Sequence, residues 1–148
     1  MRRKTILLLE DNADDAELAR AAFARSAVEH SLVILDDGID ALDYLLCRGP
    51  HADRPPVVPD VLLLDLKLPG IDGFDVLRRL RSEERTAALA VVVFTSSVEA
   101  MDVSRSYRLG ASSYVRKPVD FDEFLRVAEQ LLGYWLGLNV PPLQEVSP

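Results

Sequence analysis

Residues with chemically useful side chains follow the apolar segments of this chain at four separate places. Carboxylates follow the first and third segments, a hydroxyl group follows the fourth and an amine follows the fifth: Glu10-Asp11, Asp65, Thr95 and Lys117. If these segments are parallel strands, their carboxyl ends share one edge of the sheet, where ligands bind in open α/β sheets. Chain order alone therefore predicts that the five side chains meet at one edge.

The chemistry predicted for such a group is phosphoryl transfer. Three carboxylates placed close together repel one another, and a hard divalent cation with oxygen ligands relieves that repulsion. Mg²⁺ commonly binds one or two carboxylates, a carbonyl, waters and a phosphoryl oxygen. Lys117 adds a positive charge and Thr95 adds a hydroxyl donor. One carboxylate can then attack while the others hold the metal that neutralises the phosphoryl oxygens.

Each member of this group also has an ordinary structural explanation. An acid at a strand end is usually a helix cap or a solvated loop residue, and Asn12, Asp14 and Asp15 are expected to form the cap and first turn of the following helix. Thr95 alone fits an ordinary strand, and Lys117 before a proline fits an ordinary turn. The functional prediction therefore depends on all five residues and their order.

Five short apolar runs alternate with five amphipathic stretches. The runs, which we predict to be strands, are Thr5–Leu9, Ser31–Leu35, Val61–Leu64, Ala90–Phe94 and Ser113–Val115. Three of them are apolar without alternation, as strands buried on both faces of a parallel sheet are. The stretches with apolar residues at helical spacing are Ala13–Arg25, Asp40–Cys47, Gly73–Arg81, Glu99–Leu109 and Phe121–Leu136. The alternation predicts a three-layer α/β domain with right-handed crossovers.

Length and composition indicate one globular domain: 148 residues, 49% hydrophobic and 28% charged. Acidic residues outnumber basic ones by 24 to 17, and the resulting net charge of −7 argues against binding to nucleic acid. Cys47 is the only cysteine, which excludes an internal disulfide and a multi-cysteine metal site. No apolar run approaches the about 20 residues of a membrane span, and the run behind the basic N-terminus is too short for a signal peptide. We therefore expect a cytoplasmic protein without a membrane partner.

The order and spacing of these segments resemble a receiver domain of two-component signalling, the response regulator (CheY-like) family. The segments that carry the resemblance are Leu7–Asp11, Leu63–Gly73, Val93–Ser96 and Gly110–Pro118. The resemblance covers about residues 4–136, nearly the whole chain. It implies a flavodoxin-like three-layer sandwich, in which a five-stranded parallel sheet of order 2-1-3-4-5 is covered by five helices.

The resemblance also implies how the acidic residues act. Asp65 accepts a phosphoryl group from the phosphohistidine of a histidine kinase. Asp11 and Asp65 bind Mg²⁺ directly, the backbone carbonyl of Lys67 is the third protein ligand, and Glu10 acts through water.

Three further positions match the family pattern after the fourth and fifth strands. Thr95 and Lys117 bind the phosphoryl oxygens once Asp65 is modified. Tyr114 matches an aromatic switch position, whose side chain turns inward when Thr95 moves toward the phosphate. The Lys117–Pro118 peptide matches one that is usually cis, an isomer found almost only before proline.

Two features of this chain resemble those of the regulators paired with phytochrome-type histidine kinases. They are the insertion Gly49–Pro59, with four prolines, and an extended last helix followed by a proline-containing tail. We therefore expect a phytochrome-type sensor histidine kinase as partner. We divide the chain into a receiver domain, residues 1–137, and a C-terminal tail, residues 138–148. Because the tail is too short for an output domain, output is expected through protein contacts.

The end of the last helix and the tail carry more apolar side chains than a five-stranded domain can readily cover: Tyr134, Trp135, Leu136, Leu138, Val140 and Leu143. An exposed cluster of this size usually marks an interaction site, and aromatic anchors suit the centre of an interface. We predict a homodimer built on the face of the fourth and fifth helices and the tail. The alternative is a tail that folds back over its own domain.

Output to a downstream effector and a role as phosphorelay intermediate both stay open, whereas two other functions fit less well. A phosphorelay intermediate differs from a terminal regulator only in the next recipient of the phosphoryl group. An Asp-nucleophile phosphohydrolase would carry a second acid two residues after the nucleophile, where this chain has Lys67. A flavodoxin-type FMN carrier would need a hydroxyl- and glycine-rich loop after the first strand, whereas Glu10 and Asp11 would repel a phosphate there.

Overall fold

The structure, a computed structural model, describes residues 3–142. Its centre is a parallel sheet of five strands in the order β2-β1-β3-β4-β5. The strands are β1 (Thr5–Leu9), β2 (Ser31–Leu35), β3 (Val61–Leu64), β4 (Val91–Thr95) and β5 (Ser113–Arg116). β1 lies between β2 and β3, so that Leu7 pairs with Val33 on one side and Leu62 on the other. The predicted fold class and strand order are confirmed.

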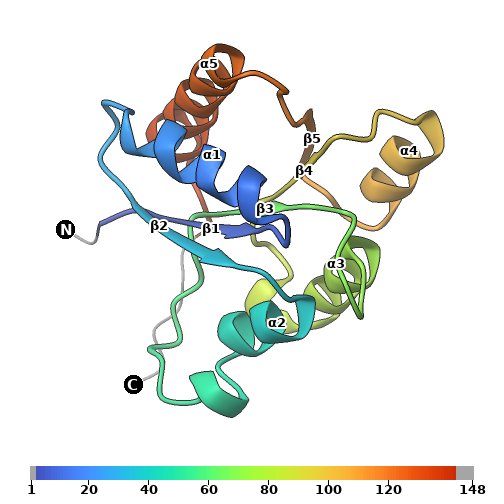
Figure 1. The fold of residues 1–148 in the computed structure, drawn as a ribbon. Helices are drawn as coiled ribbons and strands as arrows, with labels where there is room; N and C mark the ends of the chain where they lie inside the picture. Colours follow the sequence, from blue (N-terminus) through green and yellow to red (C-terminus); the bar gives the residue numbers. More distant parts are fainter. Residues whose placement is uncertain (1–2, 143–148) are drawn as a thin grey trace.

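Helices cover both faces of the sheet and make the outer two layers (Figure 1). The helices are α1 (Ala13–Ala24), α2 (Gly38–Leu46), α3 (Gly73–Ser82), α4 (Ala100–Arg108) and α5 (Phe121–Leu132). α1 and α5 lie side by side on one face, and α2 and α3 lie on the other. α4 lies beside α3, where the guanidinium of Arg105 stacks on the Phe74 ring at 4.1 Å from its centroid.

Alternate residues of the central strands enter two separate cores. Ile6 and Leu8 point toward α1 and α5, whereas Leu7 and Leu9 point toward α2 and α3. Successive side chains of a strand point to opposite faces, so a strand covered on both sides needs apolar residues throughout. This is the physical reason for the unbroken apolar run in β1.

Side-chain caps begin the helices close after the strands. Asn12 is the N-cap of α1, and its Oδ1 accepts a hydrogen bond from the Asp15 N–H at 2.9 Å. Asp37, Asp72 and Asp120 cap α2, α3 and α5 in the same way. Such caps satisfy backbone donors that the first helical turn leaves unpaired. The predicted cap at Asn12 is confirmed.

The insertion between α2 and β3 is folded against α2. Gly49–His51 forms a single 3₁₀ turn. The guanidinium of Arg54 lies 3.5 Å from the centroid of the Tyr44 ring, and His51 Nε2 lies 2.8 Å from Asp40 Oδ1. A stacked cation and a hydrogen-bonded imidazole therefore hold this proline-containing loop on the helix.

The predicted last helix, Phe121–Leu136, does not continue as one regular helix. α5 ends at Leu132, and Gly133–Leu138 forms a π-helical segment. Leu136 is buried, and its carbonyl accepts a hydrogen bond from Lys4 Nζ at 2.8 Å. This hydrogen bond joins the π-helical segment to the residue that precedes β1. Of the predicted tail, residues 143–148, with Leu143, lie outside the described residues.

The prediction of a cis Lys117–Pro118 peptide is wrong, because the described residues contain no cis peptide bond. The trans form before proline is favoured by about 0.5–1 kcal/mol unless tertiary contacts reverse the preference. Here the Lys117 N–H donates to the Thr95 carbonyl at 2.8 Å and extends the pairing of β4 with β5.

Among residues 3–142, no helix combines the length and the apolar character that crossing a bilayer requires.

Candidate functional site

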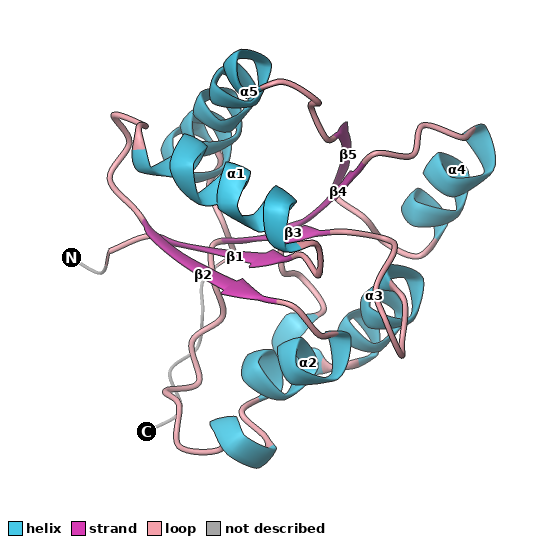
Figure 2. Ribbon diagram, viewed as in Figure 1, coloured by secondary structure: helices cyan, strands magenta, loops and turns pink. Residues whose placement is uncertain are grey.

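The predicted site residues meet at the carboxyl edge of the sheet, where loops follow β1, β3, β4 and β5 (Figure 2). Hydrogen bonds join Asp65 to Thr95 and Lys117, and Lys117 to Glu10. Asp11 lies beside them with an exposed side chain. The structure therefore brings all five residues of the sequence prediction together.

Asp65 is held from two sides. Its Oδ1 accepts hydrogen bonds from Thr95 Oγ1 at 3.0 Å and from the Lys67 N–H at 3.2 Å. Its Oδ2 accepts from Lys117 Nζ at 2.9 Å. The residue is only 6% exposed, so these donors fix the carboxylate where little water competes.

The Lys117 ammonium is surrounded by carboxylates. Besides Asp65, its Nζ donates to Asp15 Oδ2 at 3.1 Å and to Glu10 Oε1. Burial by itself would lower the pKa of Lys117, but hydrogen bonds to Glu10 and Asp65 outweigh it and raise the pKa. Lys117 therefore stays charged at neutral pH.

Glu10 is fixed by its own loop. Its Oε2 accepts a hydrogen bond from the Asn12 N–H at 3.1 Å, while Lys117 occupies Oε1. Burial raises the pKa of the Glu10 carboxyl, and the hydrogen bond from Lys117 opposes that effect. The Glu10 side chain is 2% exposed, and the Lys117 ammonium is the cation that balances its charge.

Three carboxylates of this edge are arranged as a cation site. Glu10, Asp11 and Asp65 each offer an oxygen, and these oxygens lie within 4.8 Å of one another. With Asp15 added, this edge carries four carboxylates and one ammonium, which contacts Glu10, Asp15 and Asp65. The excess of negative charge and the all-oxygen donor set fit a hard divalent cation.

Lys67 approaches the site with its backbone. The Lys67 N–H donates to Asp65 Oδ1, whereas its side chain is exposed. Gly73 makes this tight turn possible, because a Cβ on residue 73 would lie 2.4 Å from the Asp65 carbonyl oxygen. α3 can therefore begin directly against the strand end that carries Asp65.

Tyr114 connects β5 to the loop that follows β4. Its hydroxyl donates to the Ser97 carbonyl at 2.8 Å, and Ser97 Oγ donates to Asp102 Oδ2 at 2.7 Å. The ring packs against a small core of Leu66, Phe74 and Val93. Burial raises the pKa of the Tyr114 phenol. A displacement of this loop would therefore change the hydrogen bond of the Tyr114 hydroxyl and the position of its ring.

Sequence reasoning missed the contact between Asp15 and Lys117. The local pattern places Asp15 only in the first turn of α1, where its backbone N–H is capped by Asn12. Its side chain nevertheless reaches a lysine that lies 102 residues away in the sequence. Only its place in the first turn of the helix that follows β1 could have suggested this contact.

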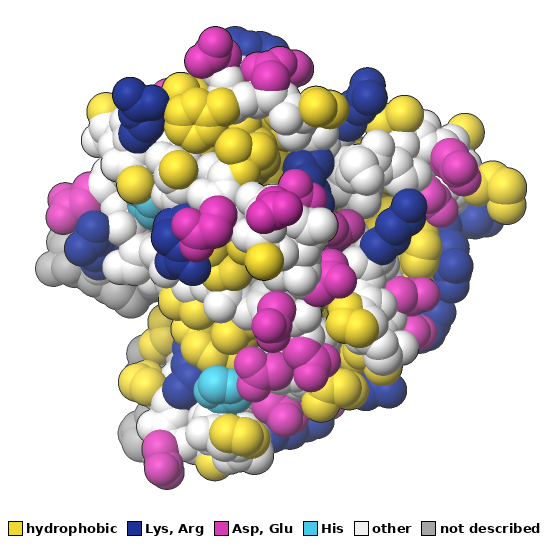
Figure 3. Space-filling model, in the orientation of Figure 1, with side chains coloured by type: hydrophobic (Ala, Val, Ile, Leu, Met, Phe, Trp, Pro, Cys, Tyr) yellow, Lys and Arg dark blue, Asp and Glu magenta, His cyan; other side chains and the backbone are white. Residues whose placement is uncertain are grey.

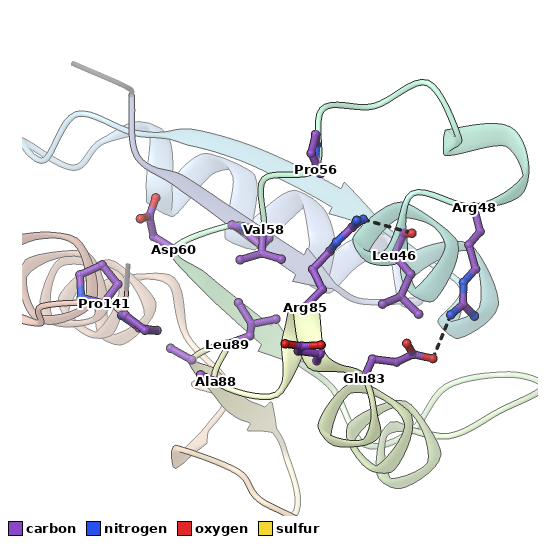
Figure 4. A pocket seen from close by; sticks show the side chains of 14 residues that line it. Leu46, Arg48, Pro56, Val58, Asp60, Glu83, Arg85, Ala88, Leu89 and Pro141 are labelled. Carbon is purple, nitrogen blue, oxygen red and sulfur yellow. Dashed lines mark hydrogen bonds and ion pairs between the residues drawn. The ribbon is translucent and has the colours of Figure 1, made fainter. Parts of the chain in front are cut away.

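A groove of about 710 Å³ lies at the opposite end of the sheet (Figure 4). It lies beside the residues that precede β3 and β4, and Val58, Leu89 and Pro141 contribute apolar surface. Arg48 donates to Glu83 at 2.9 Å at one side of it. The groove is thus separate from the carboxylate site, and Pro141 shows that the chain end runs past it.

Comparison with known proteins gives consistent results. The family model of the response regulator receiver domain matches residues 6–129. FilR2 of Methanothrix harundinacea, named a probable methanogenesis regulatory protein, is 40% identical over 137 residues, which is 93% of this chain and 86% of FilR2. The response regulator Rcp1 of Synechocystis is 33% identical over 133 residues, 90% of this chain and 89% of Rcp1.

Two solved structures show the same similarity. The phosphorylated cyanobacterial phytochrome response regulator RcpA aligns with a TM-score of 0.88 and 33% identity, covering 96% of this chain and 100% of RcpA. The Mn²⁺-bound form of Rcp1 aligns with a TM-score of 0.85 and 32% identity, covering 95% and 99%. With a family match over most of its length and a carboxylate site at the expected strand ends, this chain belongs to the response regulator receiver domain family.

Proposed function

We propose that this protein is a two-component response regulator whose Asp65 accepts a phosphoryl group from a sensor histidine kinase. The observation that carries the proposal is the position of the Asp65 carboxylate between a hydroxyl and an ammonium, beside two further acids. These are the groups that phosphoryl transfer needs, namely an attacking oxygen and cationic or donor partners for the phosphoryl oxygens. The family membership of the chain supports the same assignment.

The transfer forms one bond to phosphorus and breaks another. An oxygen of Asp65 attacks the phosphorus of a phosphohistidine and forms a new P–O bond. The P–N bond breaks, and its electron pair stays on the imidazole, which leaves neutral when its other nitrogen carries a proton. Thr95 and Lys117 then donate to phosphoryl oxygens instead of to the carboxylate alone.

A divalent cation, which we propose is Mg²⁺, would be held by Asp11, Asp65 and the backbone carbonyl of Lys67, with Glu10 acting through water. When bound, Mg²⁺ neutralises the phosphoryl oxygens and the surplus charge of the acids. The oxygens of Glu10, Asp11 and Asp65 within 4.8 Å of one another support this assignment, as does the Mn²⁺-bound form of Rcp1.

Thr95 and Tyr114 form the proposed switch. Thr95 is fully buried and now donates to Asp65, so binding a phosphoryl oxygen would draw it and the following loop toward the site. That loop carries Ser97, whose carbonyl accepts the Tyr114 hydroxyl. Phosphorylation at Asp65 would therefore change the surface formed by α4 and β5.

The partner kinase is proposed to be of phytochrome type and the protein to act in the cytoplasm. The similarity to RcpA and Rcp1 over nearly the full length of the chain supports the kinase type. No role at a membrane or on nucleic acid is proposed. The net charge of −7 supports a protein partner, and acidic side chains gather on the face that carries α1 and α2 (Figure 3).

We also propose that the protein forms a homodimer. Each protomer consists of the receiver domain, residues 1–137, and the tail, residues 138–148, which takes part in the interface. The α4–α5 face and the chain end leave apolar side chains exposed: Val98 57%, Met101 82%, Val119 86%, Tyr134 49%, Leu138 76% and Val140 89%. Part of the predicted surplus is covered within the protomer, because Leu136 is buried and Trp135 packs against the core of its own domain. The proposed interface therefore depends on Leu138 and Val140 rather than on Trp135.

The acceptor is tested by incubating the protein with acetyl phosphate and Mg²⁺ and measuring the intact mass. We expect one added phosphoryl group in the wild type, none in Asp65→Asn and none without a divalent ion. Asp53→Asn, which removes an exposed acid of the insertion, is the matched control and should be labelled like the wild type. Labelling of Asp65→Asn at the wild-type level would refute the assignment.

A further inference from the structure

The Lys117 ammonium has no free donor left in this structure. An ammonium carries three N–H donors, and here each has a carboxylate acceptor: Glu10, Asp65 and Asp15. The first two belong to the phosphoacceptor site described above. The third comes from the first turn of α1 and has no role in the proposed function so far.

The contact is specific to one of two neighbouring acids. Asp14 and Asp15 both lie in the first turn of α1, where acids interact favourably with the helix dipole. Asp15 Oδ2 lies 3.1 Å from Lys117 Nζ, whereas no contact among residues 3–142 joins Asp14 to Lys117. The two positions therefore separate the effect of the contact from that of the charge.

Phosphorylation requires Lys117 to exchange an acceptor. With its three donors already used, Nζ can exchange the Asp65 oxygen for one phosphoryl oxygen, but it can bind a further phosphoryl oxygen only by releasing Glu10 or Asp15. Releasing Glu10 is costly, because its side chain is 2% exposed and bulk water can hardly replace the hydrogen bond from Lys117. The Asp15 side chain is 39% exposed, so water can replace Lys117 there at little cost.

We propose that Asp15 is a positioning residue that holds the Lys117 ammonium in the unphosphorylated site and competes with phosphoryl oxygens for it. This inference rests on the proposed role of Asp65 as phosphoacceptor. Asp15 thereby lowers the affinity of the site for a phosphoryl group. Only hydrogen bonds are exchanged, so the transfer step itself is unchanged.

The test measures how tightly the site binds beryllofluoride, an analogue of a phosphoryl group on a carboxylate. The dissociation constant is measured by ¹⁹F NMR at Mg²⁺ concentrations shown to saturate each variant. Asp15→Asn is compared with Asp14→Asn, which removes the same charge from the same helix turn. We expect Asp15→Asn to bind beryllofluoride about two- to fivefold more tightly than Asp14→Asn, the value of one partly exposed ion pair.

A spectroscopic measurement tests the contact itself. The ¹⁵Nζ signal of Lys117, assigned by its loss in Lys117→Met, should move in Asp15→Asn and stay in place in Asp14→Asn. Asp15→Ala removes the hydrogen-bond acceptor as well as the charge of this side chain. That variant should bind beryllofluoride more tightly than Asp14→Asn as well, and it replaces Asp15→Asn if circular dichroism shows that the latter does not fold.

The outcomes separate this inference from the proposed function. Equal or weaker binding by the Asp15 variants than by Asp14→Asn overturns the competition, while Asp65 remains the acceptor. An unmoved Lys117 signal in Asp15→Asn overturns the contact. Absence of beryllofluoride binding by the wild type, together with no labelling by acetyl phosphate, overturns both proposals.

Discussion

The carboxyl edge of this sheet carries four carboxylates but only one ammonium in contact with them. Lys117 donates to Glu10, Asp15 and Asp65, and Asp11 lies within the same cluster of acids. Two of the acids are buried, so their negative charges are only weakly screened by water. The stability of the metal-free site therefore depends on Lys117. A bound divalent metal ion is expected to relieve the remaining repulsion between the carboxylates.

Replacement of this lysine tests the charge balance. Lys117→Met leaves buried carboxylates without their cation, and we expect the free energy of unfolding in urea to fall by about 3 kcal/mol without metal. Added Mg²⁺ should recover part of the loss. Lys67→Met, which removes an exposed lysine beside the same aspartate, is the control and should change stability by less than about 0.5 kcal/mol. Equal effects of the two substitutions would contradict this account.

At the scale of elements, the site depends on how closely α3 approaches the end of β3. The Gly73 N–H donates to the Leu66 carbonyl at 2.9 Å, and there is no room for a side chain between residue 73 and the backbone of Asp65. A polypeptide backbone cannot move aside as a flexible side chain can. The start of α3 and the position of the phosphoacceptor are therefore coupled.

Gly73→Ala should show this coupling. Because the added methyl would meet the Asp65 carbonyl oxygen, we expect a loss of about 1–3 kcal/mol in urea unfolding and slower labelling by acetyl phosphate. Gly133→Ala is the control, since a methyl group added there would meet nothing within 4 Å and the φ of −60° suits alanine. That substitution should be neutral or stabilise by up to about 1 kcal/mol. A stable Gly73→Ala with normal labelling would disprove the close approach.

A second prediction at this scale concerns the connection from β4 to β5. Thr95→Ala should still be phosphorylated, because Asp65 performs the attack, but Tyr114 should no longer respond. The response is measured as the change in Tyr114 ring signals by NMR when acetyl phosphate and Mg²⁺ are added. Thr95→Ser keeps the hydroxyl and should respond like the wild type. Wild-type shifts in Thr95→Ala would show that another group drives the switch.

At the scale of the whole molecule, the two ends of the sheet carry different features. The carboxyl end holds the acids and Lys117, whereas the groove beside Val58 and Leu89 lies at the amino end. The π-helical segment Gly133–Leu138 carries the chain from α5 toward that amino end, where Lys4 binds the Leu136 carbonyl. The exposed residues of the chain end therefore lie away from the phosphoacceptor, and a dimer there leaves Asp65 accessible to a kinase.

The proposed dimer predicts a change in sedimentation. Replacing both Leu138 and Val140, which are 76% and 89% exposed, by serine should shift the protein toward monomer without loss of labelling at Asp65. Ile39→Ser, at an exposed position of α2, should leave the sedimentation coefficient unchanged. A wild-type protein that sediments as a monomer at tens of micromolar, with or without acetyl phosphate, would refute the dimer.

The amino-acid sequence by itself determined the sheet and the composition of its active edge. Runs such as Ile6–Leu9 and Val61–Leu64 can be stable strands only when both faces are covered, which requires helices between parallel strands. Once the strands are parallel, the residues after them must share an edge, and Asp65, Thr95 and Lys117 do so. These are consequences of local pattern and chain order, so they could be predicted without coordinates.

The tertiary structure alone decided which distant groups touch. The side chain of Asp15 reaches Lys117 because the long Lys117 side chain extends across the edge of the sheet to the residues after β1 and β3, a placement that no local pattern encodes. The burial of Leu136 likewise depends on neighbours far away in the sequence, such as Ile6 and Phe94 of the same core. Periodicity shows which face of an element is apolar, but the contacts of a single side chain depend on how the elements are packed together.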